Sequence, residues 1–206
     1  MVSRYKQGLG VVLVLALLGS LVTCATIYVM KVHYQVPWED EGLKGKKVVF
    51  SFKDERADKH ILTKNAKKEF GSFSESFYLS VGHAEEPGHR MGVYDLGGMF
   101  EEAFHKRLEN LGIDVVEERR DSEIGLVIAL KSFQLDLVIS TWKVTLEYEA
   151  RLVKKGNVLA TQSLYGQAER FKWVGRGEAD KAVSEIFSDT VNRLDLERLF
   201  VMANIS

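Results

Sequence analysis

The sequence predicts an α+β fold, a two-layer structure in which two helices cover one face of a mostly antiparallel sheet. Three observations lead there: a strand pattern over residues 141–153, helical patterns over about 98–111 and 178–194, and an apolar N-terminal run. With 206 residues, 46% hydrophobic and 28% charged, the chain suits one domain behind a signal or anchor segment.

The N-terminal segment has the layout of an export signal. Arg4 and Lys6 precede an uncharged run over residues 8–23, and a basic region before an apolar region is typical of a secretory signal. The apolar run extends to Met30, which is long enough to span a bilayer core of about 30 Å. Its length therefore allows either a signal over residues 1–23 or an uncleaved membrane helix over residues 8–30.

The spacing of apolar residues from Tyr28 onward distinguishes these alternatives. Tyr28, Met30, Val32, Tyr34 and Val36 alternate with Lys31, His33 and Gln35. A two-residue period indicates a half-buried strand rather than the end of a spanning helix. The folded domain is therefore predicted to occupy residues 24–206 as a single exported unit, with Cys24 as the first residue of the mature chain.

Cys24 is the only cysteine, so no internal disulfide or cysteine-cluster metal site is available. Residues 21–24, Leu-Val-Thr-Cys, resemble the lipobox of bacterial lipoproteins, in which the cysteine thiol receives diacylglycerol before cleavage. Thr23 departs from the usual glycine, alanine or serine, and an uncleaved helix with Arg4 and Lys6 on the cytoplasmic side is the alternative. Ala25, in place of an aspartate, resembles outer-membrane lipoproteins.

The remaining elements follow in order along the chain. Residues 37–47 are a polar loop, residues 48–52 a short strand, and residues 53–98 a long connection, which is typical of a functional or mobile loop. Asp95 stands near the amino end of the next helix, whose buried side carries Phe100 and Phe104 and which Gly112 closes. A strand is predicted over residues 113–118.

The second half contains the strongest strand patterns. Residues 126–130 are apolar on both faces, as expected for a covered central strand. Along residues 141–153, Trp142, Leu146 and Tyr148 alternate with charged residues and are predicted to face the helices. Residues 154–157 form a turn into a partner strand, and the last helix follows at about residues 178–194.

Several runs together resemble the YajG-type family of envelope lipoproteins, over roughly residues 27–199. They are "FKDERADK", "LTKNAKKEFG", "FEEAFHKRLENLGIDV" and "LEYEARLVKKGNVLATQSLYGQ", with Asp54, Arg56, Asn65 and Gly71 among them. The resemblance implies a compartment and an architecture. Relatives of this kind have no demonstrated reaction, so it implies no mechanism.

Catalysis is not predicted, and no catalytic, metal or cofactor site is assigned. His83, Glu85, Glu86 and His89 lack the helical spacing that directs two imidazoles at one ion. Asp54 and Arg56 are interpreted as an ion pair rather than an acid/base pair. The rival hypothesis, a metal-dependent hydrolase using the 53–98 loop, requires Asp54, Arg56, His83 and His89 to converge in one pocket.

The predicted function is therefore a non-enzymatic binding or accessory module in the bacterial cell envelope. It is membrane-tethered, faces the periplasm, with the outer membrane favoured, and has other envelope proteins as partners. A net charge of −1 disfavours nucleic-acid binding. Phe73, Phe77, Tyr78 and Tyr94 are the predicted partner-binding residues, because aromatic side chains on an adaptable loop can anchor an interface. Alternatively, these rings fold back onto the sheet as a structural lid.

Overall fold

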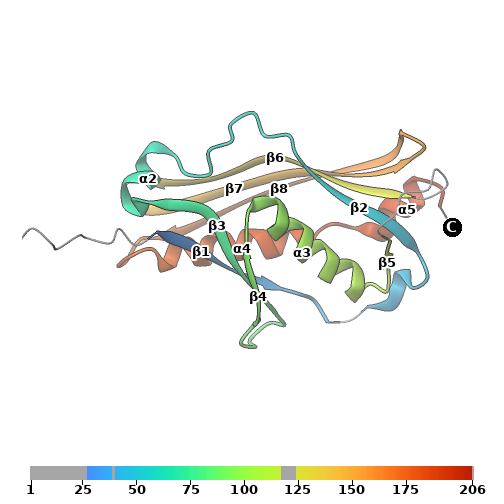
Figure 1. The fold of residues 1–206 in the computed structure, drawn as a ribbon, viewed down its shortest axis with the longest axis horizontal. Helices are drawn as coiled ribbons and strands as arrows, with labels where there is room; N and C mark the ends of the chain where they lie inside the picture. The colour runs from blue at the N-terminus through green and yellow to red at the C-terminus, as the bar shows by residue number, and fades with distance from the viewer. Residues whose placement is uncertain (1–26, 39, 117–123, 206) are drawn as a thin grey trace, which may run out of the picture.

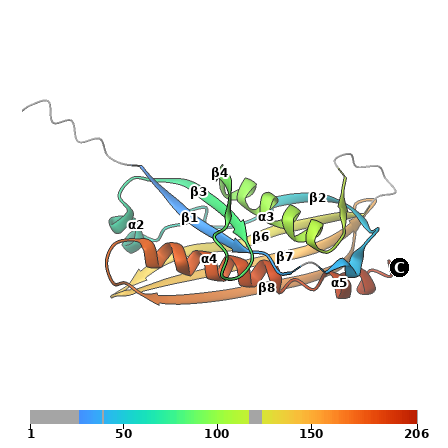
Figure 2. The ribbon, with the colours of Figure 1, turned by 90° about the horizontal axis from the view of Figure 1, so that it is seen from below.

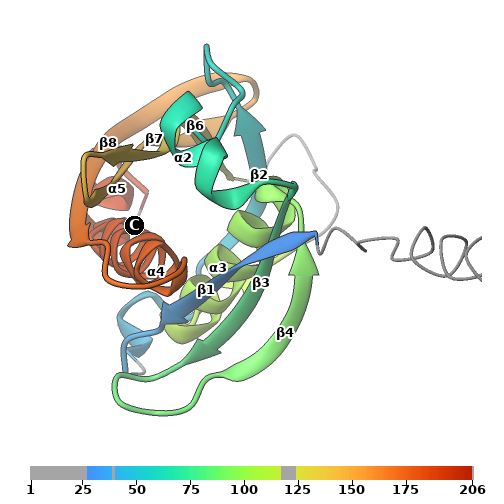
Figure 3. The same cartoon turned by 90° about the vertical axis from the view of Figure 1, so that its left-hand side faces the viewer.

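The computed structural model describes residues 27–38, 40–116 and 124–205, so the predicted signal over residues 1–23 and Cys24 lie outside the described residues. The fold is α+β, as predicted, but it has two sheets instead of one. Two long helices lie between the sheets, as the end-on view shows (Figure 3). None of the helices in the described ranges is long and apolar enough to cross a bilayer.

The larger sheet has five strands, in the order β5-β2-β6-β7-β8 (Figure 1). These are β2 (Lys47–Asp54), β5 (Asp114–Val115), β6 (Gly125–Val138), β7 (Thr141–Lys154) and β8 (Asn157–Phe171). The strands β5, β2 and β6 pair in parallel, whereas β6, β7 and β8 form an antiparallel meander. The strand pattern predicted over residues 141–153 is thus confirmed as β7.

The smaller sheet places the first strand of the domain beside residues from the middle of the chain. It consists of β1 (Tyr28–Gln35), β3 (Phe73–Gly82) and β4 (His89–Tyr94). The strand β1 runs parallel to β3, and β3 pairs antiparallel with β4. Met30, Val32 and Tyr34 are buried, so the strand predicted from the alternation after Tyr28 is confirmed.

The two long helices are α3 (Leu96–Asn110) and α4 (Gly177–Asn192), close to their predicted positions. The Gly98 amide donates to Asp95 Oδ1 at 2.8 Å, which caps α3, and Gly112 adopts the left-handed conformation predicted for its end, with φ 75°. The described residues also contain three short helices: η1 (Glu41–Leu43), α2 (Lys64–Phe70) and α5 (Leu196–Met202).

Tyr148 on β7 connects the larger sheet to both long helices. Its ring makes edge contacts with Phe100 and Phe104 of α3, and its hydroxyl donates to the Thr190 carbonyl of α4 at 2.7 Å. Tyr148, Leu146 and Trp142 are fully buried, so the predicted inward face of β7 is confirmed. Burial of three large side chains on one strand makes this face the centre of the core.

The prediction of a long loop over residues 53–98 is corrected, because α2, β3 and β4 fold within it. The helix α2 is capped by Thr63 and ends at Gly71, where φ is 58°. In β3, the alternating Phe77, Leu79 and Val81 are buried. Glycines and charged residues around these short elements hide their periods, and only tertiary packing stabilises elements of this length.

Candidate functional site

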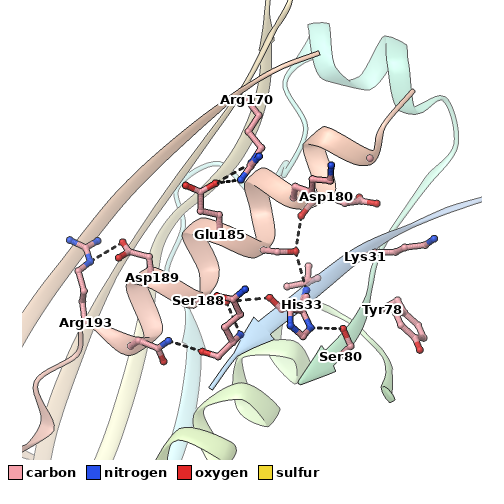
Figure 4. A pocket seen from close by; sticks show the side chains of 16 residues that line it. Lys31, His33, Tyr78, Ser80, Arg170, Asp180, Glu185, Ser188, Asp189 and Arg193 are labelled. Carbon is pink, nitrogen blue, oxygen red and sulfur yellow. Dashed lines mark hydrogen bonds and ion pairs between the residues drawn. The ribbon is translucent and has the colours of Figure 1, made fainter. Parts of the chain in front are cut away.

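A groove of about 990 Å³ opens between α4 and the smaller sheet, and polar side chains line most of it (Figure 4). The strand β1 contributes Lys31, His33 and Gln35, and β3 contributes Tyr78 and Ser80. The exposed side of α4 forms the opposite wall. Concave sites with several converging polar groups are the usual binding sites of proteins.

A ladder of hydrogen bonds joins α4 to the edge of β1. The His33 amide donates to Ser184 Oγ at 3.0 Å, and the Gln35 amide donates to Ser188 Oγ at 2.9 Å. Asn192 Nδ2 donates to the Gln35 carbonyl at 2.7 Å. Four residues of an α-helix advance about 6 Å along its axis, and two residues of a strand advance about 6.6 Å. Every fourth residue of α4 therefore lies opposite every second residue of β1. The ladder satisfies backbone groups that an unpaired strand edge would expose.

The same helical row continues to Asp180, which lies at the other end of β1. The Tyr28 hydroxyl donates to the Asp180 carboxylate at 2.7 Å. Burial raises the pKa of Asp180, although the hydrogen bond from Tyr28 opposes this shift. Burial and the Asp180 carboxylate also raise the pKa of the Tyr28 hydroxyl. The Arg176 guanidinium lies 4.9 Å from the Tyr28 ring centroid, within the range of a cation–π contact.

His33 and Ser80 meet inside the groove, where His33 Nδ1 lies 3.1 Å from Ser80 Oγ. A serine beside a histidine is the starting arrangement for nucleophilic catalysis, which also needs a third group to orient the base. Among the described residues, no carboxylate bonds to the other His33 nitrogen. Gly88 packs directly on the ring, since a Cβ there would lie 2.5 Å from His33 Cε1. The hydrogen bond between His33 and Ser80 therefore fits a structural role, in which it joins β1 to β3, better than a catalytic role.

Most charges along α4 are paired. Arg170 Nη2 lies 2.8 Å from Glu185 Oε2, and Arg193 Nε lies 2.9 Å from Asp189 Oδ2. Arg193 also donates to the Tyr165 carbonyl of β8 at 2.7 Å. These contacts compensate the charges of Glu185 and Asp189 and link this wall of the groove to the larger sheet.

The opposite wall keeps hydrogen-bond donors free. A smaller cavity of about 400 Å³ adjoins the groove and is lined by Lys31, Tyr78, Ser80, Gly88 and Arg90. Within the part of the chain that the structure describes, Lys31 and Arg90 form no ion pair, and the buried Tyr78 hydroxyl has no hydrogen-bond partner. With two cations and no carboxylate in its lining, this cavity is electropositive and suits an anionic group.

The structure separates the four aromatic residues that were predicted to bind a partner. Phe77 is fully buried and contacts Phe73 and Phe133. Phe73 and Tyr94 are half-buried and pack against the core. Tyr78 lies on the other face of β3 and lines the groove. Of these four residues, Tyr78 is the one that lines the groove, so the partner-binding prediction is kept for Tyr78 alone.

The residues of the rival hydrolase hypothesis lie in different places. Asp54, the last residue of β2, and Arg56 form a two-bond ion pair with distances of 3.0 and 2.9 Å. This pair holds the pKa of Asp54 well below its usual range. The His83 ring stacks on Trp38, and His89 is exposed on β4. Within residues 27–205, apart from the gaps given above, no three histidine, cysteine or acidic side chains are placed to hold a metal.

Sequence reasoning missed the groove because its parts are distant in the chain. Ser184, Ser188 and Asn192 contact residues about 150 positions earlier, and no local pattern encodes such contacts. The one available signal was a row of uncharged polar residues at four-residue spacing, Ser184, Ser188 and Asn192, beside the apolar face of the helix.

No protein family and no curated protein matches the sequence. Among solved structures, the fold is similar to that of a Xanthomonas campestris protein of the family DUF330, with 18% identity and a TM-score of 0.54, covering 87% of this chain and 97% of that one. A neuraminyllactose-binding hemagglutinin homolog from Helicobacter pylori matches at 11% identity and a TM-score of 0.36, covering 84% and 98%. The first likeness shows a shared fold with a bacterial protein. The resemblance to YajG-type lipoproteins stays a prediction.

Proposed function

We propose that this chain is a membrane-tethered lipoprotein of the bacterial cell envelope that acts as a non-enzymatic binding or accessory module. The signal-like residues 1–23 and the lipobox at Cys24 support the tether. The strand β1 begins at Tyr28, so only a few residues separate Cys24 from the fold. The domain then faces the periplasm close to its membrane, with the outer membrane favoured.

The observation that carries the binding role is the set of free donors beside the groove. Lys31, Tyr78 and Arg90 line one cavity, whereas most charges of the α4 wall are already paired. Unpaired cationic donors are stabilised by an incoming anionic acceptor. The site therefore binds an anionic group of another envelope component.

Binding is favoured over catalysis because the hydrolase residues do not converge. Asp54 and Arg56 lie at the end of β2 in the larger sheet, while His83 and His89 belong to the β3–β4 hairpin of the smaller sheet. In the groove, His33 and Ser80 lack the orienting carboxylate within the described residues. An acid/base mechanism needs such groups within hydrogen-bond reach.

Site-specific photo-crosslinking in intact cells tests this function. A benzophenone amino acid at position 78 is expected to form an adduct with an envelope component, and Lys31→Glu with Arg90→Glu should remove that adduct. Tyr165, which is exposed on the outer face of β8, is the matched control position. An adduct that survives both charge reversals, or that forms equally at position 165, contradicts the proposal.

A further inference from the structure

One end of the molecule carries a group of exposed hydrophobic side chains, named here the apolar end. It consists of Ile27, Val138, Ile139, Phe171, Trp173 and Val174. Ile139 is 96% exposed, Val174 93% and Trp173 77%. The Lys172 amide donates to the Ser140 carbonyl at 2.8 Å, so the β6–β7 turn and the loop after β8 lie side by side. Clustered exposed apolar residues of this kind mark an interaction surface.

The described chain begins at this same end, where β1 starts beside α2 and the start of α4 (Figures 1 and 2). The Tyr28 ring lies 5.0 Å from Phe70 of α2, and the Arg176 guanidinium lies 4.9 Å from Tyr28. Residues 1–26, with their apolar run and Cys24, therefore join the domain at the apolar end. A tether attached there holds this end nearest to the membrane.

The turn between β6 and β7 places an apolar residue where turn geometry disfavours one. Ile139 adopts φ 58°, a left-handed conformation that is unfavourable for a β-branched residue. Asparagine and glycine are the residues preferred in such two-residue hairpins. The hairpin at the opposite end of β7 follows this preference in part, with Lys155 and a positive-φ Gly156. Ile139 is thus conformationally unfavourable and 96% exposed, so neither the turn geometry nor burial in the core favours an isoleucine at this position.

Cations flank the apolar end. Lys64, Lys67 and Lys68 are exposed on α2, and the neighbouring Glu69 is paired with Lys172 at 2.7 Å. Tryptophan is enriched at membrane interfaces, and lysine is attracted to anionic headgroups. An apolar tip beside exposed lysines thus complements the headgroup region of a bilayer.

We infer that the apolar end inserts into the surface of the bilayer to which the chain is tethered, an inference that rests on the proposed tether. Ile139, Trp173 and Val174 enter the interface, and the lysines of α2 contact anionic headgroups. With a second contact besides the tether, the domain keeps a fixed orientation on the membrane. The groove along α4 is then presented at a constant angle to envelope partners.

Tryptophan quenching by lipids tests this contact with the full-length protein in vesicles of brominated phosphatidylcholine and phosphatidylglycerol. In a Trp38→Phe background the remaining indoles are Trp173 and the buried Trp142, and quenching of Trp173 is expected. In a Trp173→Phe background, Trp38 is expected to remain unquenched, because it follows the far end of β1 and is 68% exposed. Each variant thus serves as the control for the other.

Substitution at the turn separates membrane contact from folding. Ile139→Asn is expected to reduce Trp173 quenching at least about twofold, since an apolar side chain leaves the interface, while the melting temperature stays equal or rises. Val158→Asn, at the opposite end of β7 where Val158 is 56% exposed, should leave the quenching unchanged.

Vesicle flotation decides which proposal fails. A protein that does not float with vesicles refutes the tether, and this inference with it. A protein that floats while Trp173 keeps the emission of a water-exposed indole overturns the membrane contact alone. Trp173 emission that is shifted but not quenched by brominated lipid also overturns it, because a protein surface then covers the apolar end.

Discussion

Adjacent side chains on β7 occupy opposite environments. Leu146 is fully buried among the core residues, whereas Glu147 is exposed on the outer face. Leu146→Ala is expected to lower the free energy of unfolding by about 2 to 5 kcal/mol, because it leaves a cavity. Glu147→Ala should cost under about 0.5 kcal/mol. Denaturant titration of both variants measures the difference, and equal losses would refute the assigned faces.

Glu55 accepts hydrogen bonds from Arg151 and from Lys131, the latter at 2.7 Å. These cations, Arg151 first, lower the pKa of Glu55 from 4.5 to about 2. Because the folded pKa is depressed, the stabilisation is present above pH 4.5 and is lost as the pH falls toward 2. The melting-temperature gap between the native protein and Glu55→Gln should therefore shrink over this range. The melting-temperature difference will be small, because Glu55 is largely solvated. A difference that does not change with pH would contradict the ion-pair assignment.

Cys24 decides the form of the tether. Since β1 begins only a few residues later, a signal cut before Cys24 leaves the first strand intact. Intact-mass measurement of the detergent-extracted protein is expected to show a chain starting at an acylated Cys24, and Cys24→Ser should block processing. An unmodified chain that retains residues 1–23 would instead support the uncleaved helix over residues 8–30.

At the scale of elements, the ladder between α4 and β1 depends on Ser188, which accepts from the Gln35 amide and donates to the His33 carbonyl. Ser188→Ala leaves both backbone groups unsatisfied, and a loss of about 1 to 3 kcal/mol is expected. Hydrogen exchange should show faster exchange of the Gln35 amide. Ser76→Ala, on an exposed hydroxyl, is the control, and unchanged protection of Gln35 in Ser188→Ala would show that the ladder does not hold this edge.

The same elements show what a sequence can predict. Regular periods assigned β1, β7, α3 and α4 with their buried faces, because each element packs one face against a core and keeps its period. The strands β3 and β4 were missed, since a positive-φ Gly92 and a register shift interrupt their pattern. The groove was missed for a different reason: its hydrogen bonds join β1 to α4, and such distant contacts leave no local signature.

At the scale of the whole molecule, the first strand and the last long helix hold the two sheets together. The Phe187 ring on α4 contacts Tyr34 of β1 at 6.1 Å and Phe100 of α3 at 5.1 Å, between ring centroids. The helix α4 also packs against β7 and β8 of the larger sheet. Phe187 therefore belongs to a helix that contacts both sheets. The two sheets are therefore expected to unfold together rather than one after the other.

Phe187→Ala tests this coupling. The change is expected to lower the free energy of unfolding by about 3 to 5 kcal/mol, because a fully buried aromatic ring is lost. Near-ultraviolet and far-ultraviolet circular dichroism should still report one coincident transition, since loss of α4 packing releases β1 and β8 at once. Two separate transitions in the variant would show that the sheets fold independently and that a tether at Ile27 anchors only the smaller one.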